Sequence, residues 1–293
     1  MPFSHFLETC RHRVNQTLLE QVDTYTVDKR LQEAMRYSLF NGGKRIRPIL
    51  VYGSANTIGD ISPTADLAAA AVEAIHAYSL IHDDLPAMDD DSLRRGKPAC
   101  HIEFDEATAI LAGDALQTLA FEMLSQPRGL PGDILQQMIL TLTKGSGARG
   151  MVAGQSMDLT ATNQQLNLQQ LETMHGLKTG ALINASIRLG ALSTQVATAN
   201  QLNALEHYSH AIGLAFQVQD DIIDVTSDTA TLGKQQGADA NLNKPTYVSL
   251  LGLDAAKQKA KSLHQQALDA LSSFDNRADY LRHLSEYIIN RNH

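Results

Sequence analysis

Two long segments of this chain are apolar or small on nearly every side, and each ends in a cluster of carboxylates. The first is LAAAAVEAIHAYSLIHDD, residues 67–84, and the second is HAIGLAFQVQDDIIDV, residues 210–225. A helix that is apolar all round is normally surrounded by other helices and lies at the centre of a protein. Two such helices predict a bundle with an apolar interior and, at one end, an acidic mouth where a metal ion could bind.

The rest of the chain predicts further helices. Apolar side chains recur at helical offsets, as at Leu31, Met35 and Leu39. Other segments with this spacing, separated by clusters of Gly, Pro, Asp and Asn, run near 3–20, 45–58, 104–125, 132–150, 167–193, 245–271 and 276–289. No stretch has the composition of an interdomain linker, and no internal repeat is present. We therefore expect one all-α domain over residues 1–293, folded as a large helical bundle.

The composition excludes several classes of protein. Hydrophobic residues make up 43% of the chain and charged residues 19%, which is typical of a globular protein with a sizeable core. The net charge of −8 argues against a general nucleic-acid binder. No run reaches the ~18 apolar residues needed to span a bilayer, and MPFSHFLETCRHRVNQ lacks the apolar core of a signal peptide. Cys10 and Cys100 are widely separated, which fits a reducing compartment. We expect a cytoplasmic protein without a membrane span.

The first acidic cluster lies in IHDDLPAMDDDSLRR, residues 81–95. Pro86 is poorly tolerated inside a helix, so the helix that carries Asp83 and Asp84 is expected to end or bend there. A break after Leu85 would let Asp89 fold back beside the first two acids. The stretch lacks the central Gly and closing Glu of a calcium-binding EF-hand. By itself the pattern fits a solvated loop as well as a metal site.

The second acidic cluster lies on the other apolar segment. Asp220 and Asp224 are four residues apart and share a helix face, with Gln217 one turn earlier. Like charges at this spacing repel each other unless a cation neutralises them, although an exposed helix end would also tolerate them. Magnesium needs only one or two carboxylates and completes its octahedron with water and substrate phosphates. Two sparse acidic clusters therefore favour a metal-bridged phosphate over a metal site built from protein ligands alone.

Two basic clusters could bind such a phosphate. GGKRIRP places Lys44, Arg45 and Arg47 at the start of a helix, where bases oppose the helix dipole unless an anion is bound. Lys44 and Arg47 should point the same way, with Arg45 turned aside. Arg94 and Arg95 follow the first acidic cluster and could clamp phosphate oxygens in bidentate fashion. The alternatives are a solvated basic turn and an arginine pair that only neutralises the adjacent acids.

Other polar positions are weaker candidates when judged from the residues alone. His76 lies on the first apolar segment, where a histidine is more often a satisfied core residue. Lys178-Thr179-Gly180 interrupts an apolar helix and predicts a kink with an inward-facing lysine. Lys234 and Lys244 lie in a polar, Gly-containing stretch, and lysines in loops are usually solvated.

Taken together, these motifs resemble those of the trans-isoprenyl diphosphate synthases. The resemblance rests on DDLPAMD followed by RR, GGKRIRP upstream, MVAGQSMD and LKTGAL in the middle, and FQVQDDIIDV later. It covers nearly the whole chain in the right order. It is greatest to the bacterial-type members that make farnesyl diphosphate, whose first aspartate-rich motif has four residues between the Asp pair and the next Asp, as LPAM does here. It implies an all-α bundle of the isoprenoid synthase fold, usually homodimeric, around a deep apolar cavity.

The resemblance also implies a role for each candidate residue. Three magnesium ions per site would be held on the allylic diphosphate by Asp83, Asp84, Asp89, Asp220 and Asp224. That diphosphate would contact Arg94, Lys178 and Lys234, in a site lined by Thr179, Gln217 and Lys244. The isopentenyl diphosphate would be held by Lys44, Arg47, His76 and Arg95. The catalytic set would be Asp83, Asp89, Arg94, Lys178, Asp220 and Lys234. Gln155 and Asp158 would be secondary wall or metal-shell groups, and Asp90, Asp91 and Asp221 stay unassigned.

The implied reaction condenses isopentenyl diphosphate with dimethylallyl or geranyl diphosphate by ionisation, condensation and proton elimination. Metal ions and fixed cations would stabilise the leaving diphosphate, and the apolar interior would keep water from the carbocation. Tyr78 and Ser79 lie about one turn before Asp83, beside the growing chain. In the family, an aromatic side chain at the position of Tyr78 stops growth at fifteen carbons. We expect a farnesyl diphosphate synthase, with a geranyl or geranylgeranyl diphosphate synthase or a non-catalytic prenyl synthase subunit as alternatives.

Overall fold

The computed structural model describes residues 2–126, 129–161, 166–226 and 245–291, which are almost entirely helical. The helices are α1 (Phe3–Tyr25), α2 (Lys29–Leu39), α3 (Ile46–Ile58), α4 (Pro63–Asp83), α5 (Cys100–Glu103), α6 (Glu106–Ser125), α7 (Gly132–Ser146), α8 (Met151–Ala161), α9 (Leu168–His175), α10 (Ala181–Leu192), α11 (Ala199–Thr226), α14 (Tyr247–Leu251), α15 (Leu253–Ala270) and α16 (Asp279–Asn290). The short elements are the π-helical turn η1 (Gly176–Gly180), the 3₁₀ turn η2 (Asn276–Ala278) and an antiparallel pair of two-residue strands, β1 (Leu93–Arg94) and β2 (Lys97–Pro98). The all-α prediction is confirmed.

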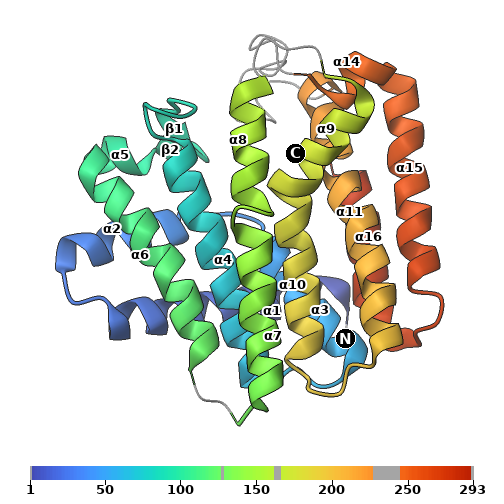
Figure 1. Ribbon diagram of the computed structural model, residues 1–293, viewed down its shortest axis with the longest axis horizontal. Helices are drawn as coiled ribbons and strands as arrows, with labels where there is room; N and C mark the ends of the chain where they lie inside the picture. The colour runs from blue at the N-terminus through green and yellow to red at the C-terminus, as the bar shows by residue number, and fades with distance from the viewer. Residues whose placement is uncertain (1, 127–128, 162–165, 227–244, 292–293) are drawn as a thin grey trace.

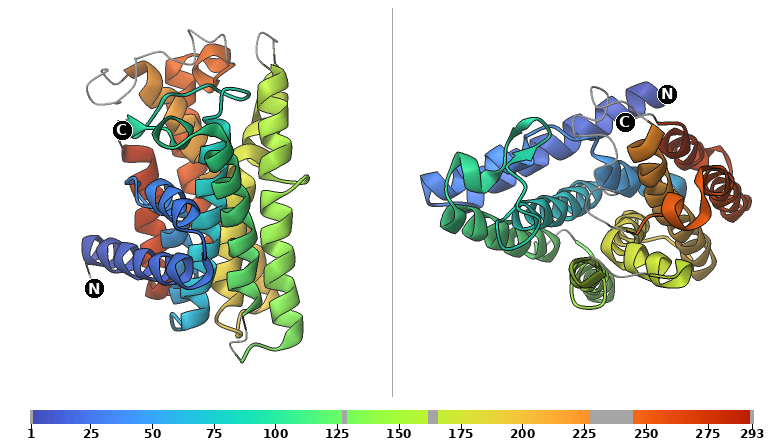
Figure 2. Two further views of the ribbon diagram at one scale, coloured as in Figure 1. Left: turned by 90° about the vertical axis from the view of Figure 1, so that its left-hand side faces the viewer. Right: turned by 90° about the horizontal axis from the view of Figure 1, so that it is seen from above.

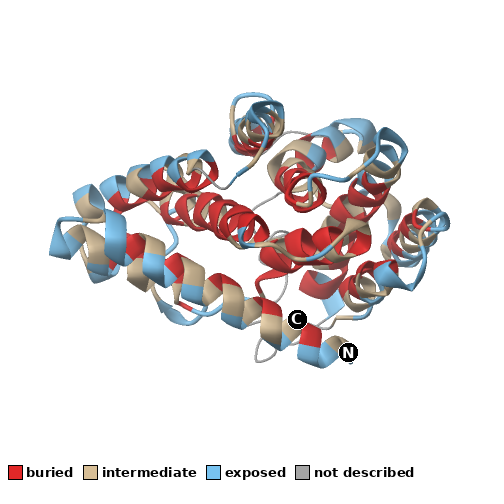
Figure 3. Cartoon of the chain, turned by 90° about the horizontal axis from the view of Figure 1, so that it is seen from below, coloured by how far each residue is buried: buried red, intermediate tan, exposed pale blue. Residues whose placement is uncertain are grey.

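Most of the long helices run along one direction and form a bundle, whereas α1 lies across it (Figures 1 and 2). Helix α4 is buried on nearly every face, from Thr64 to Ile81, because alanines and aliphatic side chains surround its axis. In helix α11, only some of the residues between Leu205 and Asp224 are buried. Figure 3 shows the buried residues concentrated in the helices at the centre. The sequence therefore identified both central helices.

A buried ion pair joins the start of α3 to the middle of α4. The guanidinium of Arg45 donates to Glu73 Oε1 at 2.7 Å and to the carbonyl of Leu39 at 2.5 Å. Its Nε also donates to Asn15 Oδ1 at 3.0 Å. Only 6% of Arg45 is exposed. As expected, Arg45 is turned aside from its two basic neighbours, and its role is to connect three segments of the core.

Several helix boundaries differ from the expected ones. Helix α1 continues to Tyr25, and the segment expected near 132–150 ends at Ser146 and is followed by the separate helix α8. The segment expected near 167–193 is continuous but changes from α9 into η1 and then into α10. This change occurs at the interruption around Lys178 that predicted a kink.

Buried apolar side chains form two clusters in the described part of the chain. The smaller cluster joins α9, α11, α14 and α15, and the larger one includes the buried faces of α1, α3, α4, α6 and α10. Both Cys10 and Cys100 are buried free thiols. Within the described ranges, no helix combines the length and the apolar character needed to cross a bilayer. The organisation as one domain over 1–293 stays a prediction.

Candidate active site

The ends of α4 and α11 lie at the same end of the bundle, together with the β1–β2 pair and α14 (Figures 1 and 2). Helix α4 ends at Asp83, two residues earlier than the expected break after Leu85. The chain then turns back, because the backbone N–H of Asp89 donates to the carbonyl oxygen of Asp83 at 2.9 Å. The expected return of Asp89 toward the first acids is therefore seen in the backbone.

Asp83 is partly buried at this mouth and carries an uncompensated charge. Within the described part of the chain, its carboxylate has neither a hydrogen bond nor an ion pair. Burial raises the pKa of Asp83 to about 6; the positive charge of Lys178 opposes this shift, and the charges of Asp89 and Asp84 add to it. A carboxylate that is costly to ionise at neutral pH is a suitable ligand for a cation.

Asp84 and Arg94 form a close ion pair beside Asp83. Asp84 is 2% exposed, and the Nε of Arg94 donates to its two carboxylate oxygens at 3.0 and 3.1 Å. The Nη2 of Arg94 also contacts Asp84 and lies 3.5 Å from Asp91. In this structure Arg94 therefore neutralises Asp84, which is the alternative that the sequence left open. Asp84 orients Arg94, and its contact with a metal stays a prediction.

Asp220, on α11, pairs with an arginine from the end of the chain. Arg291 Nη2 lies 2.5 Å from Asp220 Oδ1 and also donates to the carbonyl of Phe216 at 3.0 Å. The guanidinium carbon of Arg291 lies 4.0 Å from the centre of the Phe216 ring. The sequence did not single out Arg291, because it is an isolated base outside any motif and reaches the site only through the packing of α16.

The other two acids of this cluster are buried in the same helix. Asp224 is 4% exposed, and its predicted role as a metal ligand stays a prediction. Asp221 accepts a hydrogen bond from the backbone N–H of Tyr247 at 2.7 Å. The carboxylate of Asp221, which the sequence left unassigned, therefore connects α11 to the first residue of α14.

The π-helical turn brings Lys178 to the acids. Its Nζ lies 2.6 Å from Asp158 Oδ2, which comes from α8. Helix α8 packs very closely against the turn at Gly154, where an added Cβ would lie 2.1 Å from the backbone nitrogen of Lys178. A residue without a side chain is needed for this approach. The prediction of an inward-facing lysine agrees with this geometry.

Thr179 and Gln217 lie between the turn and α11. The hydroxyl of Thr179 donates to Gln217 Oε1 at 3.2 Å, and Gln217 Nε2 lies 3.4 Å from Asp221 Oδ1. Gln155, from α8, has both of its amide atoms buried without a hydrogen-bond partner among the described residues. Since Gln155 also lines the cavity described below, its amide group is available to a ligand.

A cavity of about 700 Å³ beside the start of α3 is lined by five basic side chains, of which Arg11 donates to the carbonyl of Lys44 and Arg45 pairs with Glu73. The other three, Lys44, Arg47 and Arg95, share the cavity with His76. Burial lowers the pKa of each of the three basic groups. Arg95 Nη1 donates to the carbonyl of Gly42 at 2.6 Å. The next residue, Gly43, has a φ of 110°, and a Cβ there would lie 2.6 Å from that guanidinium, so only glycine fits the loop.

This cavity has the character of an anion site. Burial, followed by the charges of Arg47 and Arg95, lowers the pKa of His76 well below its usual range, so the imidazole is neutral at pH 7. The Nε of Arg47 is buried without a hydrogen-bond partner among the described residues. Cations that have lost water are stabilised by an anion that accepts their hydrogen bonds. The expected grouping of Lys44, Arg47, His76 and Arg95 is therefore found.

A second cavity, of about 410 Å³, adjoins the first. Both are lined by Arg47 and His76, and the second extends past Asp83, Lys178 and Thr179 to the side chains Tyr78, Ser79, Leu80, Met88, Met151, Val152 and Leu159. Tyr78 is 6% exposed, and its ring lies 5.6 Å from that of His82 in an edge-on arrangement. The expected apolar cavity with Tyr78 in its wall is present.

Whether these residues fit magnesium follows from their chemistry. Among the described residues, no three His, Cys, Asp or Glu side chains are grouped closely enough to hold a metal by themselves. Magnesium does not require such a group, since water and substrate phosphates complete its coordination. The donors at the mouth are carboxylates, and Asp83 lacks a cationic partner, so the residues fit the ion. Lys234 and Lys244 lie outside the described residues.

Comparisons with known proteins agree with this geometry. Residues 28–285 match the family model described as polyprenyl synthetase. The chain is 50% identical to the farnesyl diphosphate synthase of Haemophilus influenzae, over 99% of this chain and 98% of that protein. It is also 50% identical to that of Escherichia coli, over the full length of both. A crystal structure of a putative farnesyl-diphosphate synthase from Marinomonas sp. MED121 superposes with a TM-score of 0.88 at 51% identity, covering 99% of this chain and 100% of that one. The chain therefore belongs to the polyprenyl synthetase family.

Proposed function

We propose that this protein is a magnesium-dependent farnesyl diphosphate synthase, which condenses isopentenyl diphosphate with dimethylallyl and then geranyl diphosphate. The observation that carries the proposal is the pair of adjoining cavities that share Arg47 and His76, one cationic and the other apolar with Asp83 at its mouth. Relatives that are 50% identical over nearly the whole chain are named farnesyl diphosphate synthase.

In this proposal the isopentenyl diphosphate occupies the cationic cavity. Lys44, Arg47 and Arg95 bind its diphosphate, which compensates them for the water lost on burial. His76 is neutral and can donate a hydrogen bond without adding a further positive charge. The double bond of the substrate then faces the shared wall and the second cavity.

The allylic diphosphate lies at the acidic mouth. Asp83, Asp89 and Asp220 would hold magnesium there, with Asp84 and Asp224 supporting, and the ion would supply positive charge for the leaving diphosphate. Arg94 and Lys178, each oriented by a carboxylate, donate to the same group. Thr179 and Gln217 line this part of the site. Lys234 and Lys244 complete the proposed set from outside the described residues.

The apolar cavity would hold the prenyl chain and exclude water from the carbocation. Tyr78 lies in its wall and is buried, so it can limit the chain to fifteen carbons, with Ser79 beside it. This assignment favours farnesyl diphosphate over the geranyl and geranylgeranyl products. The alternative of a non-catalytic subunit lacks support, since both acidic clusters are intact.

We further propose a homodimer, three magnesium ions per site and a cytoplasmic location. Exposed apolar side chains support the dimer: Ile102 on α5 is 54% exposed, and Ile110 and Leu111 on α6 are 42% and 58% exposed. A second copy of the chain would cover them.

The test is a product analysis. Purified protein with magnesium, labelled isopentenyl diphosphate and dimethylallyl diphosphate should give mainly the fifteen-carbon diphosphate, and chelation of the metal should abolish it. Asp83→Ala and Asp220→Ala should abolish it with helicity retained in circular dichroism. Absence of product from the wild-type protein would contradict the enzyme proposal, whereas a twenty-carbon product would contradict only the role of Tyr78.

A further inference from the structure

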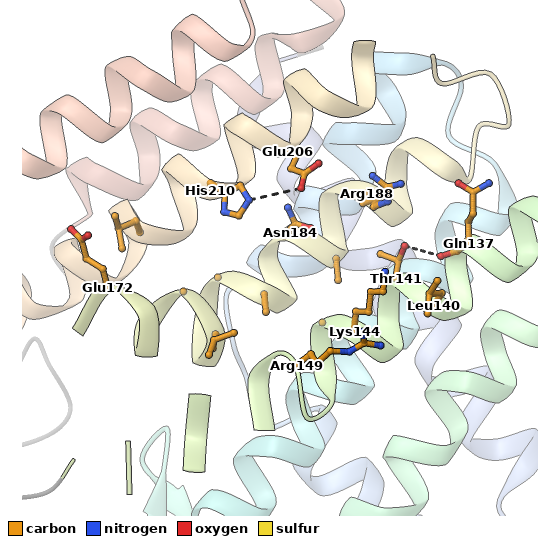
Figure 4. A pocket seen from close by; sticks show the side chains of 17 residues that line it. Gln137, Leu140, Thr141, Lys144, Arg149, Glu172, Asn184, Arg188, Glu206 and His210 are labelled. Carbon is orange, nitrogen blue, oxygen red and sulfur yellow. Dashed lines mark hydrogen bonds and ion pairs between the residues drawn. The ribbon is translucent and has the colours of Figure 1, made fainter. Parts of the chain in front are cut away.

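A groove of about 560 Å³ lies on the other side of η1 from the substrate cavities. Its walls come from α7, η1, α10 and α11 (Figure 4). Three cations line it: Lys144 near the end of α7, Arg149 just after that helix, and Arg188 on α10. Figure 4 labels all three among the side chains that line the groove. None of the three has a role in the proposed reaction.

These cations are uncompensated. Across the described ranges, the side chains of Lys144, Arg149 and Arg188 form neither a hydrogen bond nor an ion pair. Of the two acids that line the same groove, Glu172 is paired with Lys259 at 2.5 Å, whereas Glu206 lies 4.0 Å from His210 and offsets only one of the three positive charges. The groove therefore presents an excess of positive charge from three separate segments, which an anion would neutralise.

The groove also has an apolar lining, which includes Leu140, Leu177, Ala181, Ala185 and Leu214. Leu140 is 44% exposed, so a bound apolar group would remove it from water. Cations and aliphatic side chains that line one groove are complementary to a molecule that is anionic at one end and apolar at the other.

We propose that this groove binds an organic phosphate that carries an apolar chain. Lys144, Arg149 and Arg188 hold the phosphate, and the chain lies against Leu140 and Leu177. The site is separate from the substrate cavities but touches the same turn: Gly176, Leu177 and Gly180 line the groove, whereas Lys178 and Thr179 line the substrate cavity. A ligand in the groove therefore contacts the turn that carries Lys178.

A fluorescent reporter can test this site selectively, because the chain contains no tryptophan. Leu140→Trp, at the exposed edge of the groove, is titrated with octyl phosphate below its critical micelle concentration and without magnesium. A saturable change in emission is expected. Adding Arg149→Gln or Arg188→Gln should weaken binding about tenfold, as expected for the loss of a charged hydrogen bond. Lys261→Gln, on the exposed face of α15, is the matched control and should leave binding unchanged.

Equilibrium dialysis with the tryptophan-free protein provides a second measurement. The Arg149→Gln/Arg188→Gln variant should bind one octyl phosphate fewer per chain than Lys261→Gln, with unchanged helicity. Equal binding by these two proteins would overturn the proposal, as would inorganic phosphate that binds as tightly as octyl phosphate. An emission change of Leu140→Trp on dilution without ligand would also overturn it, because a second copy of the chain would then cover the groove.

Discussion

The uncompensated charge of Asp83 predicts that this residue lowers the stability of the metal-free protein. Burial raises its pKa from 3.8 to about 6, and each pKa unit corresponds to about 1.4 kcal/mol. The ionised carboxylate therefore costs up to about 3 kcal/mol at neutral pH. Because the side chain is only partly buried, we expect Asp83→Asn to stabilise the metal-free protein by about 1–3 kcal/mol at pH 7.5.

The pH dependence has a definite sign. The folded protein binds the proton of Asp83 more tightly than the unfolded chain does, so the stability contributed by this group is present at low pH and is lost as the pH rises from about 4 to about 6. The difference in free energy of unfolding between Asp83→Asn and wild type should thus be small at pH 4 and constant above pH 7. Urea unfolding in EDTA, followed by circular dichroism, measures it.

The control is Glu33→Gln, which changes an exposed carboxylate on α2. The free energy of unfolding of Glu33→Gln relative to wild type should not change between pH 4 and pH 7 as it does for Asp83→Asn. In the presence of magnesium and inorganic diphosphate, wild type should become more stable than Asp83→Asn, because ligand stabilises only the protein that binds it. A metal-free Asp83→Asn protein that is less stable than wild type at pH 7.5 would refute the reasoning, as would a difference that is equal at pH 4 and pH 8.

Three further predictions concern the cavity wall, the core and the turn. Tyr78→Ala should shift the product from fifteen to twenty carbons, as measured by chromatography of the dephosphorylated products; an unchanged product would exclude Tyr78 as the limit. Arg45→Ala should lower the free energy of unfolding by about 3–5 kcal/mol, because it leaves a buried carboxylate unpaired. The control is Arg30→Ala, at an exposed pair, which should cost less than about 1 kcal/mol. Equal losses in urea unfolding would contradict the structural role of Arg45. Gly154→Ala should lower kcat with helicity retained, because its Cβ would displace the backbone of the turn. Gly176→Ala, where a Cβ meets no atom within 4 Å, should keep kcat near wild type. Equal kcat values for these two variants would argue against close packing of α8 on the turn.

Local chemistry explains which features the sequence predicted well. Pro86 and the acids around it predicted the return of Asp89 to Asp83, since a proline cannot continue the helix. The interruption at Lys178 predicted a kink, which is a π-helical turn in the structure. Lys44 and Arg47 line one cavity as predicted, although not through a shared helix face, because α3 begins only at Ile46 and Lys44 lies before it.

Features that depend on tertiary packing were not predictable in the same way. The pair between Asp220 and Arg291 exists only because α16 returns along α11 and brings the end of the chain to the mouth. The residues left open whether Arg94 would neutralise the adjacent acids, and its pairing with Asp84 depends on the geometry of the returning loop. The three cations of the groove come from segments with no shared motif.

The central claim is that the acids at the ends of α4 and α11 hold a magnesium-bound allylic diphosphate over the apolar cavity. A crystal structure with magnesium and a thio analogue of geranyl diphosphate, which resists ionisation, tests it most directly. We predict magnesium bound to Asp83 and Asp220, the diphosphate between them, and the geranyl chain directed toward Tyr78. A diphosphate bound away from these two acids, or a geranyl chain outside the cavity that Tyr78 lines, would contradict the claim.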